Sequence, residues 1–467
     1  MSGALGSVDS TCACRRAKVA TMAPTEQVLD LLPDSAEVSE GRITVAGMGL
    51  GEIAERFGTP AYVIDVATFR NRARAMREGL ALRWASSEVL FASKSLPALA
   101  MYELAVGEGL SVDVAGDGEL RLALAAGVDP ERIYFHGNAK TSGELELATN
   151  SGVGTIIVDN ADELERLRHL VPRGSRQDVL VRLLPGVTAP THPSQETGGP
   201  ASKFGLPLDQ AVALMQEIRD SPNLRLRGVH VHIGSQILET GPFAEAVRRM
   251  AAVGDHDVYD LGGGLGVRYT PDERAPSIDE YLDALTGAAR EVLPPESKLL
   301  IEPGRSLVAS AGVTLYRVLS VKRTGRTFVA VDGGMADNLD VALTRQRYEA
   351  LVDGRARSPG TVTCTVVGRQ CESGDKLIDE ISLPDPAAGD LLVMLVTGAY
   401  SYTMANNYNG AYIPPLIFAE HGNCHEATRR QRFQDILTLQ HPLGLEASSH
   451  RHTSRPGAPP HLTHRHT

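Results

Sequence analysis

Residues 89–94 read Val-Leu-Phe-Ala-Ser-Lys, a short apolar run that ends in a lysine. This pattern is typical of a buried strand that ends at Lys94. Burying an ammonium group is costly unless the group is paired or neutralised. A lysine that loses its charge readily can form a Schiff base with a carbonyl compound. From this segment alone, exposure of Lys94 to solvent at the strand end is the simpler interpretation.

Seven more short apolar runs follow, and amphipathic segments separate them. The eight runs lie at 89–93, 110–114, 132–136, 155–158, 179–184, 226–233, 257–261 and 298–302. Helical patterns occur at 98–108, 118–126, 161–170, 208–219 and 278–292. Eight alternating units predict an α/β fold, a closed (β/α)8 barrel of the TIM type. An open doubly wound sheet is the alternative, but the glycines at 262–264 follow the seventh strand, where a dinucleotide-binding motif does not belong.

The pattern changes after Val308 to runs rich in Val, Leu and Thr that Gly, Pro and Asp interrupt, which predicts a C-terminal β-domain. These runs lie at 313–321, 327–331, 362–367 and 391–396. The expected organisation is a disordered N-terminal extension (1–27), a segment that contributes to the β-domain (28–64), the barrel (65–307), the β-domain (308–441) and a disordered tail (442–467). A short helix is expected at 50–57, and the polar loop 194–200 is a candidate lid over the barrel.

Composition limits the classes of function. The net charge of −11 argues against general nucleic-acid binding, and no apolar stretch is long enough to span a membrane. The five cysteines form neither paired zinc motifs nor a disulfide framework, and the N-terminus lacks the apolar core of a secretory signal. We therefore expect a cytoplasmic protein without a metal site, and a histidine-rich tail that is simply solvated.

The active sites of such barrels lie at the carboxyl ends of the strands. In this chain those ends carry Lys94, Asp113, His136, Asn138, Arg182, His230, His232, Ser235, Gly262, Gly263, Gly264, Glu302 and Arg305. The glycines allow backbone N–H groups to approach an anion, and Arg305 can bind a phosphate. Beside an amine that forms Schiff bases, this set favours pyridoxal 5′-phosphate (PLP) as cofactor. Glu302 would hold the pyridine nitrogen protonated, and His232 could stack on the ring.

Seven segments carry a resemblance to a known family. They are FASKS at 91–95, GVHVHIGSQI at 228–237, DLGGGLG at 260–266, EPGR at 302–305, VDGGMADN at 331–338, CESGD at 371–375 and GAYSYTMANNYNG at 398–410. In this order and spacing, the chain resembles the diaminopimelate decarboxylases, which belong to the alanine-racemase-like (fold type III) PLP-dependent decarboxylases. The resemblance extends from Gly58 to about Leu437.

The resemblance implies a barrel followed by a β-domain, and a homodimer whose active sites are shared across the interface. It implies that the cofactor is bound by Lys94, Asp113, His232, Ser235, Gly262, Gly263, Gly264, Glu302, Gly304, Arg305 and Tyr400. Catalysis would use Lys94 together with Cys371 of the other subunit as proton donor. A thiol suits this task, because its ordinary pKa of about 8.5 keeps it protonated near neutral pH. Glu372, Arg305 and Tyr400 would contact the amino-acid substrate.

The chain departs from the family pattern at the expected distal end of the substrate. The family usually carries Arg-Pro-x-Leu-Tyr-Gly shortly after the segment at 331–338, and its arginine and tyrosine grip a distal carboxylate. Here Asp340 stands at the arginine position and Thr344 at the tyrosine position. An aspartate should repel a carboxylate, although Arg345 is near enough in sequence to compensate. FASKS also replaces the commoner YAxKA.

Three functions therefore remain open. The formal expectation is PLP-dependent decarboxylation of meso-2,6-diaminopimelate to L-lysine and CO2 in lysine biosynthesis. The alternative is a decarboxylase retuned to another amino acid, either lysine- or ornithine-like or a specialised-metabolism substrate, because Asp340 with Glu372 would suit a distal amine. A regulatory homologue without activity is the third, and the presence of Lys94, Glu302, Arg305 and Cys371 argues against it.

Overall fold

The computed structural model describes residues 24–199 and 202–443. They fall into a large unit that ends at Arg430 and a short C-terminal segment from Gln431, which contains helix α13 (Phe433–Leu437). The predicted disorder of 1–23 and 444–467 lies outside the described residues. The structure does correct the N-terminal boundary, because helix α1 spans Pro24–Leu29 and so begins inside the extension predicted to be disordered.

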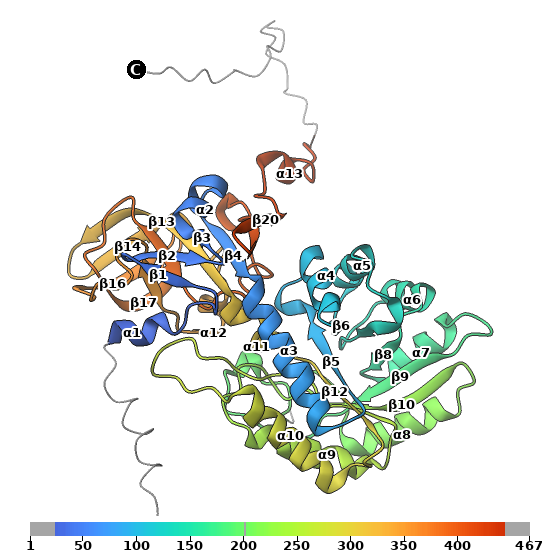
Figure 1. Ribbon diagram of the computed structural model, residues 1–467. Helices are drawn as coiled ribbons and strands as arrows, with labels where there is room; N and C mark the ends of the chain where they lie inside the picture. The colour runs from blue at the N-terminus through green and yellow to red at the C-terminus, as the bar shows by residue number, and fades with distance from the viewer. Residues whose placement is uncertain (1–23, 200–201, 444–467) are drawn as a thin grey trace, which may run out of the picture. The chain divides into compact units, whose positions relative to one another are not determined.

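Eight parallel strands close into a barrel, as the sequence predicts (Figure 1). Its strands are β5 (Ser87–Ala92), β6 (Ser111–Val114), β7 (Ile133–Phe135), β8 (Thr155–Val158), β9 (Gln177–Arg182), β10 (Leu224–His230), β11 (Val258–Asp260) and β12 (Lys298–Ile301). The ring closes where β12 pairs with β5, with Ile301 opposite Val89. Each observed strand overlaps one of the eight apolar runs.

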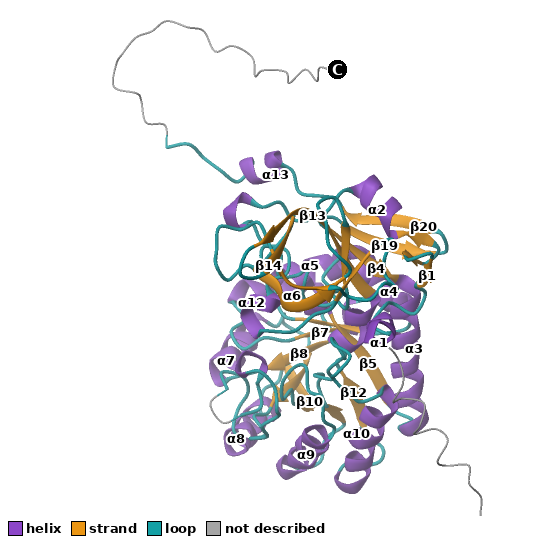
Figure 2. Cartoon of the chain, turned by 90° about the vertical axis from the view of Figure 1, so that its left-hand side faces the viewer, coloured by secondary structure: helices purple, strands orange, loops and turns teal. Residues whose placement is uncertain are grey.

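Helices cover the outside of the barrel (Figure 2). They are α3 (Val66–Arg83), α4 (Leu99–Gly107), α5 (Asp117–Ala125), α6 (Ser142–Ser151), α7 (Ala161–Leu170), α8 (Leu208–Arg219), α9 (Gly241–Met250) and α10 (Ile278–Val292). Capping boxes start α6 at Thr141 and α10 at Ser277, so that the side chains satisfy the first free N–H groups. Inside the barrel, one apolar cluster consists of Leu90, Tyr134, Ile157, Leu180, Val258 and Leu300. The interior of the barrel is therefore filled with packed side chains, which fix the positions of the strand ends.

The second sheet forms the β-domain. Its strands are β4 (Ala61–Asp65), β13 (Gly312–Arg323), β14 (Thr327–Val331), β15 (Ala350–Val352), β16 (Val362–Val367), β17 (Lys376–Leu383), β18 (Leu391–Met394), β19 (Leu416–Glu420) and β20 (Asn423–Thr428). Strand β4 lies between β13 and β19 in this sheet, which places the N-terminal segment within the β-domain. Strands β15, β17, β19 and β20 were not expected: β15 has only three residues and β17 and β20 are rich in polar residues, whereas β19 is an apolar run that was missed in the sequence.

The remaining elements connect these two parts. Strands β1 (Glu37–Ser39), β2 (Arg42–Val45) and β3 (Met48–Gly49) form a small antiparallel sheet before helix α2 (Leu50–Phe57), which has the predicted bounds. Two short helices, α11 (Arg305–Val308) and α12 (Asp340–Thr344), each begin at a residue that the sequence assigns to the site. Among the described residues, no helix is long and apolar enough to cross a membrane.

Candidate active site

The carboxyl ends of the barrel strands bring the predicted polar residues together. Lys94 lies in a single helical turn directly after β5, and its side chain is half-buried. Asp113 at the end of β6 and His230 at the end of β10 are buried. His136 and Glu302, which follow β7 and β12 directly, are buried as well. Five different strands therefore contribute to one site, as expected for this fold.

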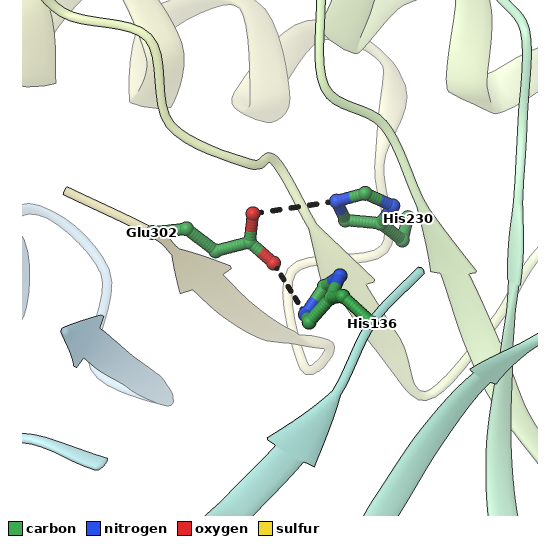
Figure 3. Close-up of side chains that lie close together, drawn as sticks. All are labelled: His136, His230 and Glu302. Carbon is green, nitrogen blue, oxygen red and sulfur yellow. Dashed lines mark hydrogen bonds and ion pairs between the residues drawn. The ribbon is translucent and has the colours of Figure 1, made fainter. Parts of the chain in front are cut away.

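Glu302 is the centre of this site, and two histidines face its carboxylate (Figure 3). His136 Nε2 lies 2.9 Å from Oε1, and His230 Nε2 lies 3.4 Å from Oε2. Burial by itself raises the pKa of Glu302, but the two imidazoles outweigh it and hold this pKa well below its ordinary value. Glu302 is therefore an anion at neutral pH, as required to keep a bound ring nitrogen protonated.

Two histidines of the site, His230 and His232, stay neutral near this anion. Burial lowers the pKa of His230 to about 4 and that of His232 well below its ordinary value. Asp113 lies 3.7 Å from His136, and burial raises the pKa of this carboxyl to about 6. Burial thus favours the neutral forms of His230, His232 and Asp113, close to one strongly acidic carboxylate.

The structure corrects the simplest argument about Lys94. Burial alone lowers its pKa, but Tyr400, Asp113 and Glu302 outweigh that effect, and the net shift is upward. In this chain by itself, Lys94 is a cation held among anionic and phenolic groups. It becomes a nucleophile only when one of these interactions changes, because the free amine is the reactive form.

The triple glycine is required by close packing. A Cβ on Gly263 would lie 2.1 Å from the carbonyl oxygen of Glu302, and one on Gly262 would lie 2.1 Å from that of Val231. The N–H of Gly263 donates to Nδ1 of His232 at 3.2 Å, which fixes the imidazole beside the glycine turn. A larger residue would push this turn away from both strand ends and displace His232.

Arg305 forms the second polar part of the site. Its guanidinium donates to the Ser235 hydroxyl at 3.3 and 3.4 Å and to the Tyr269 hydroxyl, and it lies 4.7 Å from the centre of the Tyr400 ring. Tyr400 itself has a left-handed backbone (φ 65°) and donates its N–H to the carbonyl of Ser95 at 2.9 Å. Gly304 is also tightly packed, because a Cβ there would lie 3.1 Å from that of Ala92. Arg305 and Ser235 together can bind an anion close to Lys94.

Asp340 lies against Arg305, where it is only 2% exposed. Its Oδ2 is 4.0 Å from Nη1 of Arg305 and accepts a hydrogen bond from the Tyr348 hydroxyl at 2.9 Å. Its Oδ1 accepts one from the Thr344 hydroxyl at 3.0 Å. Tyr348 and Tyr269 were not predicted at this place from the sequence, because the two tyrosines lie far apart in the chain. Arg305 is therefore already paired with an internal carboxylate.

Arg345 does not join this group. It is exposed, has a left-handed backbone (φ 58°), and lines a cavity of about 740 Å³ together with Tyr348, Ser373 and Gly374. The compensation for Asp340 that its position in the sequence suggests is not seen in the structure. The left-handed residue at the end of α12 turns its side chain away from the buried face that carries Asp340.

Cys371 and Glu372 lie in the exposed loop between β16 and β17. The N–H of Cys371 donates to Oδ1 of Asn409 at 2.7 Å, and Glu372 accepts a hydrogen bond from the Tyr408 hydroxyl at 3.1 Å. These two hydrogen bonds link the loop to the 406–410 turn, while the backbone of Glu372 bonds to Gln370 and Asp375 within the loop itself. Within one chain they form a second polar group outside the buried site around Lys94.

The donor set around Lys94 fits PLP. A lysine amine can bind an aldehyde, the anionic Glu302 suits a protonated pyridine nitrogen, and Arg305 with Ser235 suits a phosphate. Buried polar atoms in the same place, Nδ1 of His230 and Oδ2 of Asp260, have no hydrogen-bond partner among the described residues. A polar ligand in contact with the site would reduce the cost of burying such atoms.

Comparison with known proteins agrees with this geometry. Residues 66–309 match the family model described as the pyridoxal-binding domain of pyridoxal-dependent decarboxylases. The diaminopimelate decarboxylase of Bacillus subtilis is 41% identical over 88% of this chain and 97% of its own length. That of Actinosynnema pretiosum is 42% identical over 87% and 94%. The crystal structure of the M. jannaschii diaminopimelate decarboxylase with L-lysine has a TM-score of 0.80 at 28% identity, covering 88% of this chain and 98% of that one.

These relatives span nearly their whole length on this chain, and the matched domain contains every barrel residue of the site. The chain therefore belongs to the diaminopimelate decarboxylase family of pyridoxal-dependent decarboxylases.

Proposed function

We propose that this protein decarboxylates meso-2,6-diaminopimelate to L-lysine and CO2 in lysine biosynthesis, with PLP as cofactor. The observation that carries the proposal is the buried, anionic Glu302, which faces His136 and His230 at the same strand ends as Lys94 and Arg305. The identity of 36–42% to named diaminopimelate decarboxylases over most of the chain supports this choice of substrate.

Each residue has a role in this proposal. Bound PLP supplies an electron sink for the negative charge that remains when CO2 leaves. Lys94 holds the cofactor covalently, and Glu302 keeps the proton on its pyridine nitrogen. Arg305, Ser235 and the glycines at 262–264 hold its phosphate, while Asp113 and His232 orient its ring. The buried walls of the barrel exclude water from the reacting carbon.

The proton that replaces CO2 would come from Cys371 of a second subunit. The hydrogen bonds of Cys371 and Glu372 to the 406–410 turn, and their exposure, support a homodimer in which these residues complete the partner's site. The barrel (65–307) would then supply the cofactor residues, and the β-domain (28–64 with 308–441) would supply the proton donor. Free Cys364, Cys371 and Cys424 suit the reducing cytoplasm, which is the proposed location.

The direct test is turnover of meso-diaminopimelate by the PLP-loaded protein, followed as CO2 release and L-lysine formation. Lys94→Ala should abolish turnover and the visible absorption band that borohydride removes from the wild-type protein. Lys203→Ala, at an exposed lysine outside the site, is the matched control. A wild-type protein that binds PLP but releases no CO2 from diaminopimelate would contradict the assignment of substrate.

A second candidate is a decarboxylase for an amino acid that carries a distal ammonium group and no distal carboxylate, such as lysine or ornithine. The contact between Asp340 and Arg305 favours it. Arg305 must already serve the cofactor phosphate, and the buried Asp340 offsets its charge, so that a second carboxylate finds little attraction there. Arg345, the nearest further cation in the sequence, is exposed.

A substrate series separates the two candidates. We would compare kcat/KM for meso-diaminopimelate, L-lysine, L-ornithine and L-glutamate, first in the wild type and then in Asp340→Arg/Thr344→Tyr. If the second candidate is correct, the wild type prefers lysine or ornithine, and the double variant shifts preference toward diaminopimelate. Preference of the wild type for diaminopimelate, with loss of that activity in the double variant, would reject it.

A further inference from the structure

The loop that carries Cys371 is held at its base by one buried carboxylate, that of Asp375. This side chain is 3% exposed, although the four residues before it are exposed. Its Oδ1 accepts the N–H of Met335 and its Oδ2 accepts the N–H of Gln370, both at 2.7 Å. One carboxylate therefore joins the loop at 368–375 to the turn at 333–338.

Two glycines make room for this carboxylate. A Cβ on Gly368 would lie 2.3 and 2.4 Å from the two Asp375 oxygens, and a Cβ on Gly334 would lie 2.6 Å from each. One backbone bond joins the same segments, from Arg369 N–H to the Gly333 carbonyl at 2.9 Å, and another closes the loop itself, from Gly368 N–H to the Asp375 carbonyl at 3.1 Å. Burial raises the pKa of Asp375, and the two N–H groups oppose that shift. A buried group with this many specific contacts fixes the local backbone.

The other side of the loop is held by the 406–410 turn. Asn409 accepts the N–H of Cys371, and the Tyr408 hydroxyl donates to Glu372. This turn is itself bound to the first one, because Asn406 donates its N–H to the Ala336 carbonyl at 2.8 Å. The turns at 333–338 and 406–410 and the loop at 368–375 thus form one hydrogen-bonded group, with Asp375 at its buried centre and Cys371 and Glu372 at its exposed tip.

We infer that Asp375 is a positioning residue that sets the place of the Cys371 thiol and the Glu372 carboxylate. The inference rests on the proposed function, in which Cys371 gives its proton to the substrate carbon: the S–H bond breaks, the new C–H bond forms, and solvent returns a proton to the thiolate. A donor on an exposed loop needs an anchor, because displacing a reacting group by about 1 Å can cost roughly a hundredfold in rate.

The test compares Asp375→Asn with Asp379→Asn, which makes the same chemical change four residues later on β17. Asp379 is exposed, and its carboxylate pairs with Lys376 at 2.9 Å. Asp375→Asn keeps the shape of the side chain. One of the two backbone N–H groups, that of Met335 or that of Gln370, then faces the amide NH2 group and loses its acceptor. We expect Asp375→Asn to lower kcat roughly ten- to a hundredfold without changing the PLP absorption band, and Asp379→Asn to match the wild type.

The configuration of a deuterium label in the product distinguishes a misplaced proton donor from a smaller amount of folded enzyme. When the reaction runs in D2O, a fixed donor delivers deuterium to one face, and the L-lysine formed carries the label in one configuration. Asp375→Asn should give a mixed configuration, whereas a smaller active fraction alone would leave the label pure. A pure label together with a kcat equal to that of Asp379→Asn would overturn the inference.

Two further measurements keep the inference testable if the first variant folds poorly or the substrate is different. Asn409→Gly removes the acceptor for the Cys371 N–H and retains the left-handed backbone (φ 53°), so it should also give a mixed label. The rate of alkylation of Cys371 by iodoacetamide needs no substrate. It should rise in Asp375→Asn while that of Cys424 stays constant. Unchanged alkylation in both variants would reject the positioning role, and wild type without turnover would reject only the proposed function.

Discussion

Two buried carboxylates in the site, Glu302 and Asp340, have similar burial and different surroundings. Glu302 is 4% exposed and faces two imidazoles; Asp340 is 2% exposed and faces two hydroxyls and a guanidinium. The imidazoles hold the pKa of Glu302 well below its ordinary value, whereas Asp340 is surrounded by two hydroxyl donors and one guanidinium that is always charged. Burial alone therefore does not determine the role of a carboxylate, because its neighbours decide whether its charge is available to a ligand or is paired with another side chain.

The largest effect should come from Glu302→Gln. The neutral amide cannot hold a protonated ring nitrogen, so kcat should fall roughly a hundred- to a thousandfold, as when one preorganised electrostatic contact is lost. Steady-state kinetics at saturating PLP measure this effect. Glu296→Gln, at an exposed site six residues earlier, is the control and should behave as wild type. A near-normal kcat in Glu302→Gln would mean that catalysis does not need the negative charge of Glu302, and the proposed contrast with Asp340 would fail.

The second prediction concerns pH and the histidines of the Glu302 group. The pKa of His230 is about 4 in the folded chain, against about 6.5 unfolded. Between these values the unfolded chain binds more protons, so stability rises with pH through this window and is lost as pH falls. The contribution is at most about 3 kcal/mol. Between pH 4 and 6.5, the unfolding free energy measured with urea should therefore rise more steeply with pH in the wild type than in His230→Asn. Equal slopes in the two proteins would contradict the lowered pKa of His230.

Asp113 should affect the pH dependence of stability in the direction opposite to His230. Its pKa of about 6 lies above its ordinary value because of burial. The folded chain then binds more protons between about pH 4 and 6, and this carboxyl costs stability as pH rises. The slope of unfolding free energy against pH should become more positive in Asp113→Asn, at a size of up to about 3 kcal/mol over the window. A less positive slope in that variant would show that His136, which opposes the shift, dominates.

Asp340→Asn addresses the other carboxylate. The change keeps the shape but leaves the buried Arg305 without its nearest counter-charge, so we expect a loss of about 2 kcal/mol in unfolding free energy. It should also raise kcat/KM for meso-diaminopimelate relative to L-lysine, because Arg305 becomes a stronger carboxylate partner. Asp385→Asn is exposed and serves as control for stability. If the ratio of kcat/KM for meso-diaminopimelate to that for L-lysine stays unchanged, Asp340 does not determine substrate specificity.

The smallest effect should come from Tyr348→Phe, which removes the hydroxyl that donates to Asp340. Thr344 and Arg305 still face the carboxylate, so the cost should be about 1 kcal/mol. Thermal or urea unfolding measures this change, and Tyr412→Phe, at an exposed tyrosine, is the control. A loss as large as that of Asp340→Asn would mean that Tyr348 provides most of the stabilisation of the Asp340 carboxylate.

The barrel and most of its site were predictable, because each barrel strand is a short apolar run whose last residues are polar. Lys94, Asp113, His230 and Glu302 follow from that rule alone. The β-domain strands β17 and β20 were missed, since their alternating or polar patterns resemble loops when neighbouring strands are unknown. Tyr348, which donates to Asp340, and Tyr269, which accepts from Arg305, were also missed, because contacts between distant segments leave no local pattern.

Periodicity and short motifs are local properties of the chain, so they were enough to predict the order of the barrel strands, the residues at their ends and the family. That Lys94 is held as a cation, that Asp340 pairs with Arg305 and that Arg345 is exposed could be seen only in the folded chain. These outcomes depend on distances of a few ångströms between residues far apart in sequence, where burial and Coulomb interactions determine the charge of each group.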